Sequence, residues 1–108
     1  MPALSPELKA CIDTCNDCME AANACLSAHM GEAEMERCLQ LCLDCTDLCA
    51  ACVQMMARQS EFAGRVCAVC ADLCMACADE CAQFDSEECQ RCTEACRACA
   101  EHCREMAA

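Results

Sequence analysis

Apolar positions in this chain recur at alternating steps of four and three residues in four successive segments. The clearest segment steps through Cys38, Cys42, Cys45, Cys49 and Cys52. These steps return to one face of an α-helix at every turn, so the pattern predicts four amphipathic helices. The seam of such a helix usually holds Leu, Ile or Val, but here it holds cysteine. The other seam cysteines are Cys11, Cys15, Cys18 and Cys25, then Cys67, Cys70, Cys74, Cys77 and Cys81, and finally Cys89, Cys92, Cys96, Cys99 and Cys103.

The first two helices have recognisable boundaries. Ser5 followed by Pro6 is typical of a helix start, with a side-chain cap and a proline at the first helical position. We therefore predict a helix over residues 6–28. Gly31 interrupts the pattern, and a second helix is predicted over residues 32–58.

The last two helices follow from the same signals. Ser60 is placed to cap a third helix over residues 61–83. Asp85, with Glu88 three residues later, forms a variant capping box that predicts the start of a fourth helix, which continues to about Met106.

Four helices with cysteine stripes can bury those stripes together only if all four face one axis. Short connections make successive helices antiparallel neighbours. The sequence therefore predicts an all-α, up-down-up-down four-helix bundle with a cysteine-lined core. Residues 1–108 are expected to form this bundle as a single domain, since the four helices use nearly the whole chain.

Charge and composition limit the classes of function. The net charge is −12, with only seven Lys and Arg, and aromatic residues make up 2% of the chain. Nucleic-acid binding is disfavoured because basic side chains and stacking platforms are both scarce. We find no basic, apolar leader at the N-terminus and no stretch of about 18 uncharged apolar residues. We therefore expect a cytoplasmic protein that does not enter membranes and keeps its thiols reduced.

Three uses of the nineteen cysteines compete. Cysteine can serve as a small buried hydrophobe, but nineteen in helical phase exceed what packing needs. A disulfide framework is disfavoured by the odd number of cysteines, by the reducing compartment and by the geometry of pairs four apart on one helix. Metal binding is the use that the pattern favours.

The choice of metal depends on geometry and charge. Thiolates at i and i+4 on a straight helix can clasp one soft ion in a near-linear arrangement, whereas structural zinc sites usually form from loop knuckles. Thiolates are also favoured ligands of Cu(I). About one monovalent ion per sulfur cancels the thiolate charge, while about five divalent ions in four-sulfur sites cancel only about half. These arguments favour many Cu(I) ions.

Two other classes stay open as alternatives. One is a metallothionein-like Zn or Cd buffer. The other is an enzyme, a thiol–disulfide oxidoreductase, although such a protein usually carries one CxxC after a strand and no strand is predicted. Iron–sulfur ligation is disfavoured because neither proline lies near a cysteine.

Extending the seams beyond the cysteines identifies the two ends of the core. His29, Met35 and Phe84 are predicted to share one end, and the other end is predicted to hold Leu8, Met56 and Met106. An imidazole and a thioether can bind Cu(I) transiently. We therefore predict that His29 and Met35 hand ions to the interior thiolates. His102 lies off the seam, which makes a ligand role there less favoured.

The outer faces of the helices differ in polarity. The first two helices carry extra apolar residues beside their cysteines, whereas the fourth carries charged ones. Because sulfur already fills the core, the extra apolar surface predicts a contact between subunits and hence a homo-oligomer.

The chain resembles the bacterial copper storage proteins, a family of cysteine-rich four-helix bundles. Repeated CxxxCxxC runs such as Cys11-Cys15-Cys18 and Cys38-Cys42-Cys45 carry the resemblance, which covers essentially the whole chain. It is similar to the cytosolic branch, because the exported branch has a twin-arginine signal. The resemblance implies a homotetramer of bundles that stores many Cu(I) ions on pairs of thiolates, without catalysis. It implies that all nineteen cysteines are copper ligands, and a copper chaperone or chelator is a candidate partner.

Overall fold

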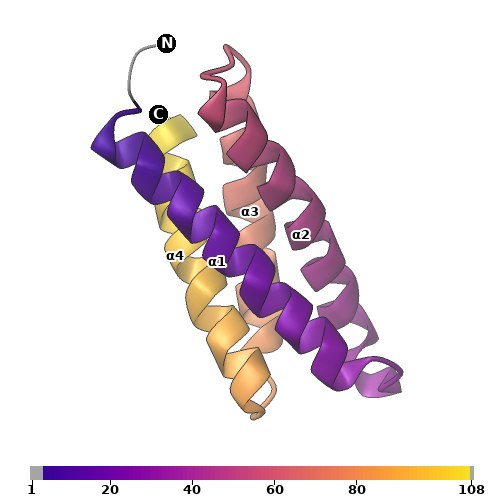
Figure 1. Ribbon diagram of the computed structural model, residues 1–108. Coiled ribbons are helices and arrows are strands. Elements are labelled where there is room, and N and C mark those ends of the chain that lie inside the picture. The colour runs from indigo at the N-terminus through magenta and orange to yellow at the C-terminus, as the bar shows by residue number, and fades with distance from the viewer. Residues whose placement is uncertain (1–3, 108) are drawn as a thin grey trace.

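The computed structural model describes residues 4–107, which form a bundle of four long helices (Figure 1). Met1–Ala3, part of the segment used to argue against an export leader, lie outside the described residues, as does Ala108. The elements are α1 (Pro6–His29), a 3₁₀ turn η1 (Ala33–Met35), α2 (Glu36–Ala57), α3 (Ala63–Cys81) and α4 (Glu87–Ala107).

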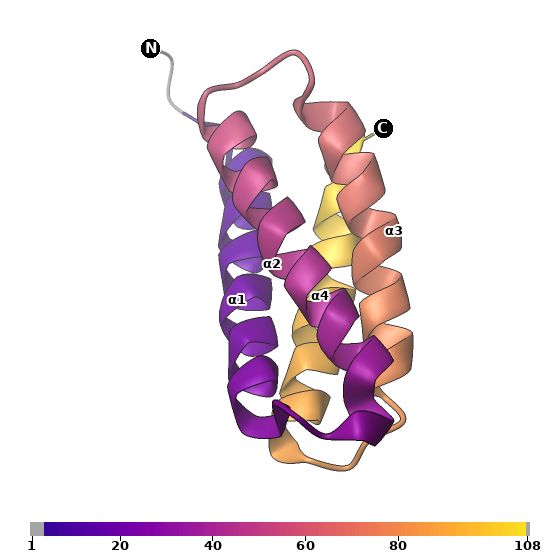
Figure 2. The same ribbon diagram turned by 90° about the vertical axis from the view of Figure 1, so that its right-hand side faces the viewer.

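Successive helices run antiparallel around a common axis. α1 packs against α2 and α4, and α3 packs against the same two helices on their other sides. Figure 2 shows the resulting rod, with the α1–α2 and α3–α4 turns at one end and the α2–α3 turn at the other. Its principal extents are 46 × 18 × 18 Å. The predicted all-α four-helix bundle is confirmed.

The start of α1 forms as the sequence predicts. The hydroxyl of Ser5 accepts a hydrogen bond from the Leu8 N–H at 3.1 Å, and Pro6 occupies the first helical position. Gly31 follows the helix with φ +90°, a conformation that costs glycine little because it has no Cβ. η1 then precedes α2, so the second helix begins at Glu36, four residues later than predicted.

The predicted caps of the last two helices are partly wrong. Asp85 does not cap α4. Instead, the helix begins at Glu87, so Ser86 occupies the capping position. Its hydroxyl accepts a hydrogen bond from the N–H of Cys89, three residues later, at 3.1 Å. Ser60 acts within the α2–α3 turn, where its hydroxyl accepts the Phe62 N–H at 3.1 Å.

Sulfur fills the core from end to end. All nineteen cysteines have no exposed surface, and the buried residues among them are mainly alanines. Met56 is the largest fully buried side chain, at the end with the α2–α3 turn. Each thiol offers less packing volume than a leucine, so alanines and cysteines let the helices approach closely around a thin axis.

One segment meets a composition test for crossing a membrane. Ala33–Ala57 has a window with a mean hydropathy of 1.3 and few charged residues. Much of that hydropathy comes from the α2 cysteines, which are buried against the other helices rather than available to lipid. Within the bundle, α2 therefore buries its cysteine face and leaves its other faces at least partly exposed.

Candidate metal centre

The nineteen cysteines are all reduced and form one continuous column of sulfur. Neighbouring helices bring thiols within contact distance at several levels of the bundle. Sγ–Sγ distances include 3.6 Å for Cys15–Cys99 and Cys18–Cys96, 3.7 Å for Cys49–Cys70, and 3.1 Å for Cys38–Cys81. These pairs join different helices, so a bound ion would link helices as well as sulfurs.

Thiols also meet across the diagonals of the bundle. The Sγ atoms of Cys42 and Cys92, from α2 and α4, lie 3.9 Å apart, as do those of Cys18 and Cys74, from α1 and α3. Diagonal helices are the pair farthest apart in a four-helix bundle. Sulfur contact across both diagonals means that the axis itself is filled by thiols.

Some of the pairs predicted along a single helix are present as well. Thiols four residues apart approach to 3.8–3.9 Å in α3 and α4. An ion between such sulfurs needs little movement of backbone, because both ligands stand on one rigid helix. These pairs are Cys70–Cys74, Cys77–Cys81, Cys92–Cys96 and Cys99–Cys103.

Larger groups of sulfurs also converge. Several sets of three or four Sγ atoms lie within 4.8 Å of one another, and every member is buried. Neighbouring sets share members, so one thiolate can bridge two ions. The sets include Cys15, Cys49, Cys70 and Cys99; Cys18, Cys49, Cys74 and Cys99; Cys25, Cys38, Cys42 and Cys81; Cys42, Cys77, Cys81 and Cys92; and Cys11, Cys15 and Cys103.

The remaining cysteines belong to the same column. Cys52 and Cys67 are fully buried, and each thiol interacts with the other and with that of Cys103. The Cys45 thiol donates to the carbonyl of Leu73 at 4.0 Å. The structure thus brings all nineteen predicted cysteines into one core.

Burial controls the protonation of thiols near one end of the column. Loss of hydration raises the pKa of Cys38 to about 12 and that of Cys89 to about 11. Deeper in the column, hydrogen bonds between thiols couple the groups, and the Cys42 thiol lowers the pKa of Cys92 to about 6. A monovalent cation that replaces a thiol proton removes the cost of a buried thiolate.

The ends of the column have the composition that the seams predict. His29 is 15% exposed at the end with the α1–α2 and α3–α4 turns, and Met35 is buried there. Both imidazole nitrogens of His29 have partners, Nδ1 with the Glu32 carboxylate at 2.5 Å and Nε2 with the Ser86 hydroxyl at 2.8 Å. The hydrogen bond that the Glu32 carboxylate accepts from the imidazole raises the pKa of His29. His102 is about one-third exposed, with Nδ1 3.9 Å from the Glu105 carboxylate.

Ser86 is the residue of this region that the sequence argument missed. It caps α4 and contacts His29, which is 57 residues earlier in the chain. A Ser three residues before Cys89 was available as a capping signal, but the acidic pair Asp85 and Glu88 matched the capping-box pattern better. The contact with His29 has no signal in the sequence.

Comparison with known proteins places the chain in a family. No curated protein matches the sequence. The sequence profile of the copper storage protein family matches residues 4–108. Among solved structures, the apo form of copper storage protein 3 from Bacillus subtilis is 44% identical, with a TM-score of 0.88, and the match covers 93% of this chain and 98% of that chain.

Two copper-containing proteins are similar over nearly the same length. The Cu(I)-bound copper storage protein BsCsp3 is 43% identical with a TM-score of 0.90, and the match covers 94% of this chain and 99% of that chain. A cytosolic copper storage protein from Streptomyces lividans, solved with five coppers, is 34% identical with a TM-score of 0.88, covering 94% of this chain and 92% of that chain. Because the family profile spans almost the whole sequence and the fold matches at these identities, the chain belongs to the copper storage protein family.

Proposed function

We propose that this copper storage protein holds many Cu(I) ions inside the bundle, with all nineteen cysteines as ligands. The observation that carries the proposal is the unbroken column of buried thiols, with Sγ–Sγ distances of 3.1–3.9 Å across and along the helices. Soft thiolates suit Cu(I), and the related proteins include a Cu(I)-bound storage protein and one loaded with 10 copper equivalents.

The column stores ions by replacing thiol protons with Cu(I). Because neighbouring ions share bridging thiolates, each bound Cu(I) displaces about one thiol proton and balances the charge of one thiolate, which the core cannot hold uncompensated. Adjacent sulfur sets share cysteines such as Cys42 and Cys49, so an ion bound in one set already holds a deprotonated ligand of the next set. An ion can therefore move along the axis by exchanging one sulfur ligand at a time.

The arrangement favours storage over the two alternatives. A zinc or cadmium buffer has suitable four-sulfur sets, but about five divalent ions leave about half of the thiolate charge uncompensated in a buried core. A thiol–disulfide oxidoreductase needs a reactive, accessible thiol, and all nineteen thiols here are buried. We therefore propose that the protein has no catalytic turnover.

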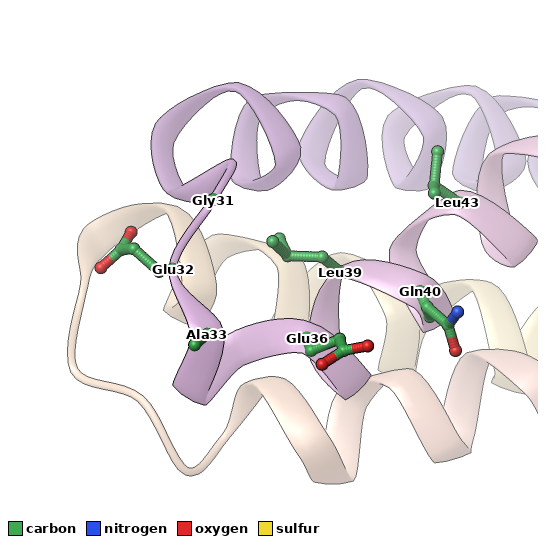
Figure 3. A pocket seen from close by; sticks show the side chains of 7 residues that line it. All are labelled: Gly31, Glu32, Ala33, Glu36, Leu39, Gln40 and Leu43. Atoms are coloured by element: carbon green, nitrogen blue, oxygen red, sulfur yellow. The ribbon is translucent and has the colours of Figure 1, made fainter.

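We further propose that the protein forms a homotetramer through the face that α1 and α2 share. Met30 is 78% exposed and Leu43 is 52% exposed on this face. Leu26 and Leu39 line a groove between the same two residues. Figure 3 shows Leu39 near the turn at Gly31 and Leu43 farther along α2, with its side chain directed toward α1. An apolar groove of this kind is suited to burial against another subunit.

The proposed setting is the cytosol, where thiols stay reduced, as for the related protein from Streptomyces lividans. The proposed partners are copper ions, further copies of this chain, and a copper chaperone or chelator that delivers or removes the ions. Transient copper binding by His29 and Met35 stays a prediction, as does the assignment of residues 1–108 to a single domain.

An anaerobic titration tests the storage function. Reduced protein is titrated with Cu(I) against a competing Cu(I) chelator, with helicity followed by circular dichroism and Zn(II) titrated in parallel. Uptake of many Cu(I) ions per chain by a bundle that is helical from the start is expected. Saturation after a few ions, or tighter binding of Zn(II), would contradict storage and favour the buffer.

A further inference from the structure

His29 connects two turns that are distant in sequence. It is the last residue of α1, and its Nδ1 hydrogen-bonds the Glu32 carboxylate at 2.5 Å in the following turn. Its Nε2 hydrogen-bonds the Ser86 hydroxyl at 2.8 Å, just before α4. The imidazole therefore has no free nitrogen in this structure, and its two hydrogen bonds fix the orientation of the ring.

Ser86 extends this connection into α4. The same hydroxyl oxygen accepts the N–H of Cys89 at 3.1 Å. A chain of hydrogen bonds thus runs from Glu32 through His29 and Ser86 to the backbone of Cys89. It joins the α1–α2 turn to the first turn of α4.

The connection lies one helical turn outside a pair of thiols on the same two helices. Cys25 precedes His29 by four residues on α1, and Cys89 follows Ser86 by three residues. The Sγ atoms of Cys25 and Cys89 are 3.8 Å apart. Because residues three or four apart share a helix face, the contact between His29 and Ser86 acts on the spacing of α1 and α4 at this pair, beside the ion pair of Arg91 with Glu20 at 2.6 Å.

Cys25 and Cys89 stand on α1 and α4, whereas the other sulfurs that converge on Cys25, those of Cys38, Cys42 and Cys81, stand on α2 and α3. Ala22 stands at the next inward seam position of α1, where a cysteine would continue the stripe, and it is fully buried. Cys25 therefore has no sulfur neighbour one turn inward on its own helix. Its position relative to Cys89 depends on what holds the two helices together at this end.

We infer that His29 is a positioning residue, which acts through Ser86 to hold Cys25 and Cys89 at the spacing for one Cu(I) ion. This role rests on the proposed storage function and is the alternative to the copper binding predicted for His29 itself. Residues that orient metal ligands typically contribute 10–100-fold to metal affinity. We therefore expect His29→Ala to weaken copper binding at this pair by about tenfold while leaving the middle of the column unchanged.

Substitutions at Ser86 separate positioning from ligation. Ser86→Ala removes the partner of His29 without removing the imidazole, so positioning predicts the same loss as His29→Ala and no further loss in the double variant. Ser86→Thr keeps a hydroxyl and should preserve the wild-type affinity. Ser5→Ala is the matched control, because it also removes a helix N-cap but at the other end of the bundle.

Site-resolved alkylation measures the effect. Copper-loaded wild-type and variant proteins are incubated with increasing concentrations of a Cu(I) chelator, then with iodoacetamide, and the modified cysteines are identified by mass spectrometry. In His29→Ala and Ser86→Ala, Cys25 and Cys89 should become alkylated at about tenfold lower chelator concentration. Cys18 and Cys96, with Sγ atoms 3.6 Å apart near the middle of the column, serve as the internal reference and should not change.

The ¹⁵N chemical shifts of the His29 imidazole give an independent readout. Positioning predicts no copper-induced change of the size that metal ligation causes. Such a change, or a loss in His29→Ala without a loss in Ser86→Ala, would overturn positioning in favour of ligation. Unchanged protection of Cys25 and Cys89 in both variants would overturn any role for the connection. Failure of the proposed storage function would differ from these results, because copper would then leave Cys18 and Cys96 unprotected in the wild-type protein.

Discussion

Loading the copper-free protein with Cu(I) should release close to one proton per ion. Two thiolates at the 3.8 Å separation of Cys11 and Cys103 repel each other by roughly 4 kcal/mol at an effective dielectric constant of about 20. That repulsion corresponds to about three pKa units, and burial adds to it. The copper-free core therefore holds mainly neutral thiols, and full loading of nineteen cysteines should release on the order of nineteen protons per chain.

The same stoichiometry fixes the pH dependence of storage. Because each ion displaces about one proton, its apparent affinity should fall about tenfold per pH unit of acidification, or about 1.4 kcal/mol. An anaerobic pH-stat titration in weak buffer, with copper counted in parallel, measures the ratio. Cys49→Ala should lower both counts by about one and leave the ratio unchanged. Release of less than about half a proton per ion would refute the reasoning, because the buried thiols would then already be ionised.

Three further predictions concern stability and capacity. The pKa values of Cys38 and Cys89 are raised from 9.0 to about 12 and about 11. Folding stability gained from keeping these two thiols neutral is therefore present below pH 9.0 and is lost as the pH rises from 9.0 through about 11 and about 12. Urea unfolding across this range should show the loss in copper-free protein, and a flat profile would contradict it. Ala22→Cys adds a thiol at a fully buried seam position and should raise the copper-to-protein ratio by about one. The added volume should lower the unfolding free energy of the copper-free form by about 1–3 kcal/mol. An unchanged ratio would contradict one ion per sulfur. Met56→Ala should lower the free energy of unfolding in urea by about 2–5 kcal/mol without changing copper capacity, because Met56 is fully buried. Met30→Ala, at a site 78% exposed, should change this free energy by less than about 0.5 kcal/mol. Equal effects of the two substitutions would contradict the burial of Met56.

The fold could be predicted from the sequence because one physical requirement dominates it. Four cysteine stripes at helical spacing can be buried together only around a shared axis, and short turns then make the helices antiparallel. The α1 boundaries followed from Ser5, Pro6 and Gly31, which act locally. Such features depend on residues a few positions apart, and the sequence displays them directly.

Features that depend on packing were not predictable in the same way. The capping box at Asp85 and Glu88 is a sound local pattern, but Ser86 stands at the position where its hydroxyl meets the Cys89 N–H. The partners of His29 depend on how two turns meet at one end of the bundle. The periodicity of the cysteines was enough to predict that they form a column. Which sulfurs pair depends on the rotation of each helix about its own axis, and the sequence does not give that rotation.

A crystal structure of the Cu(I)-loaded protein, with copper located by anomalous scattering, tests the central claim most directly. We expect many copper peaks inside the bundle, arranged along the axis, each bound by Sγ atoms of two or more cysteines and with the four helices in place. Copper peaks confined to surface carboxylates or histidines, with the cysteine column left empty, would contradict it.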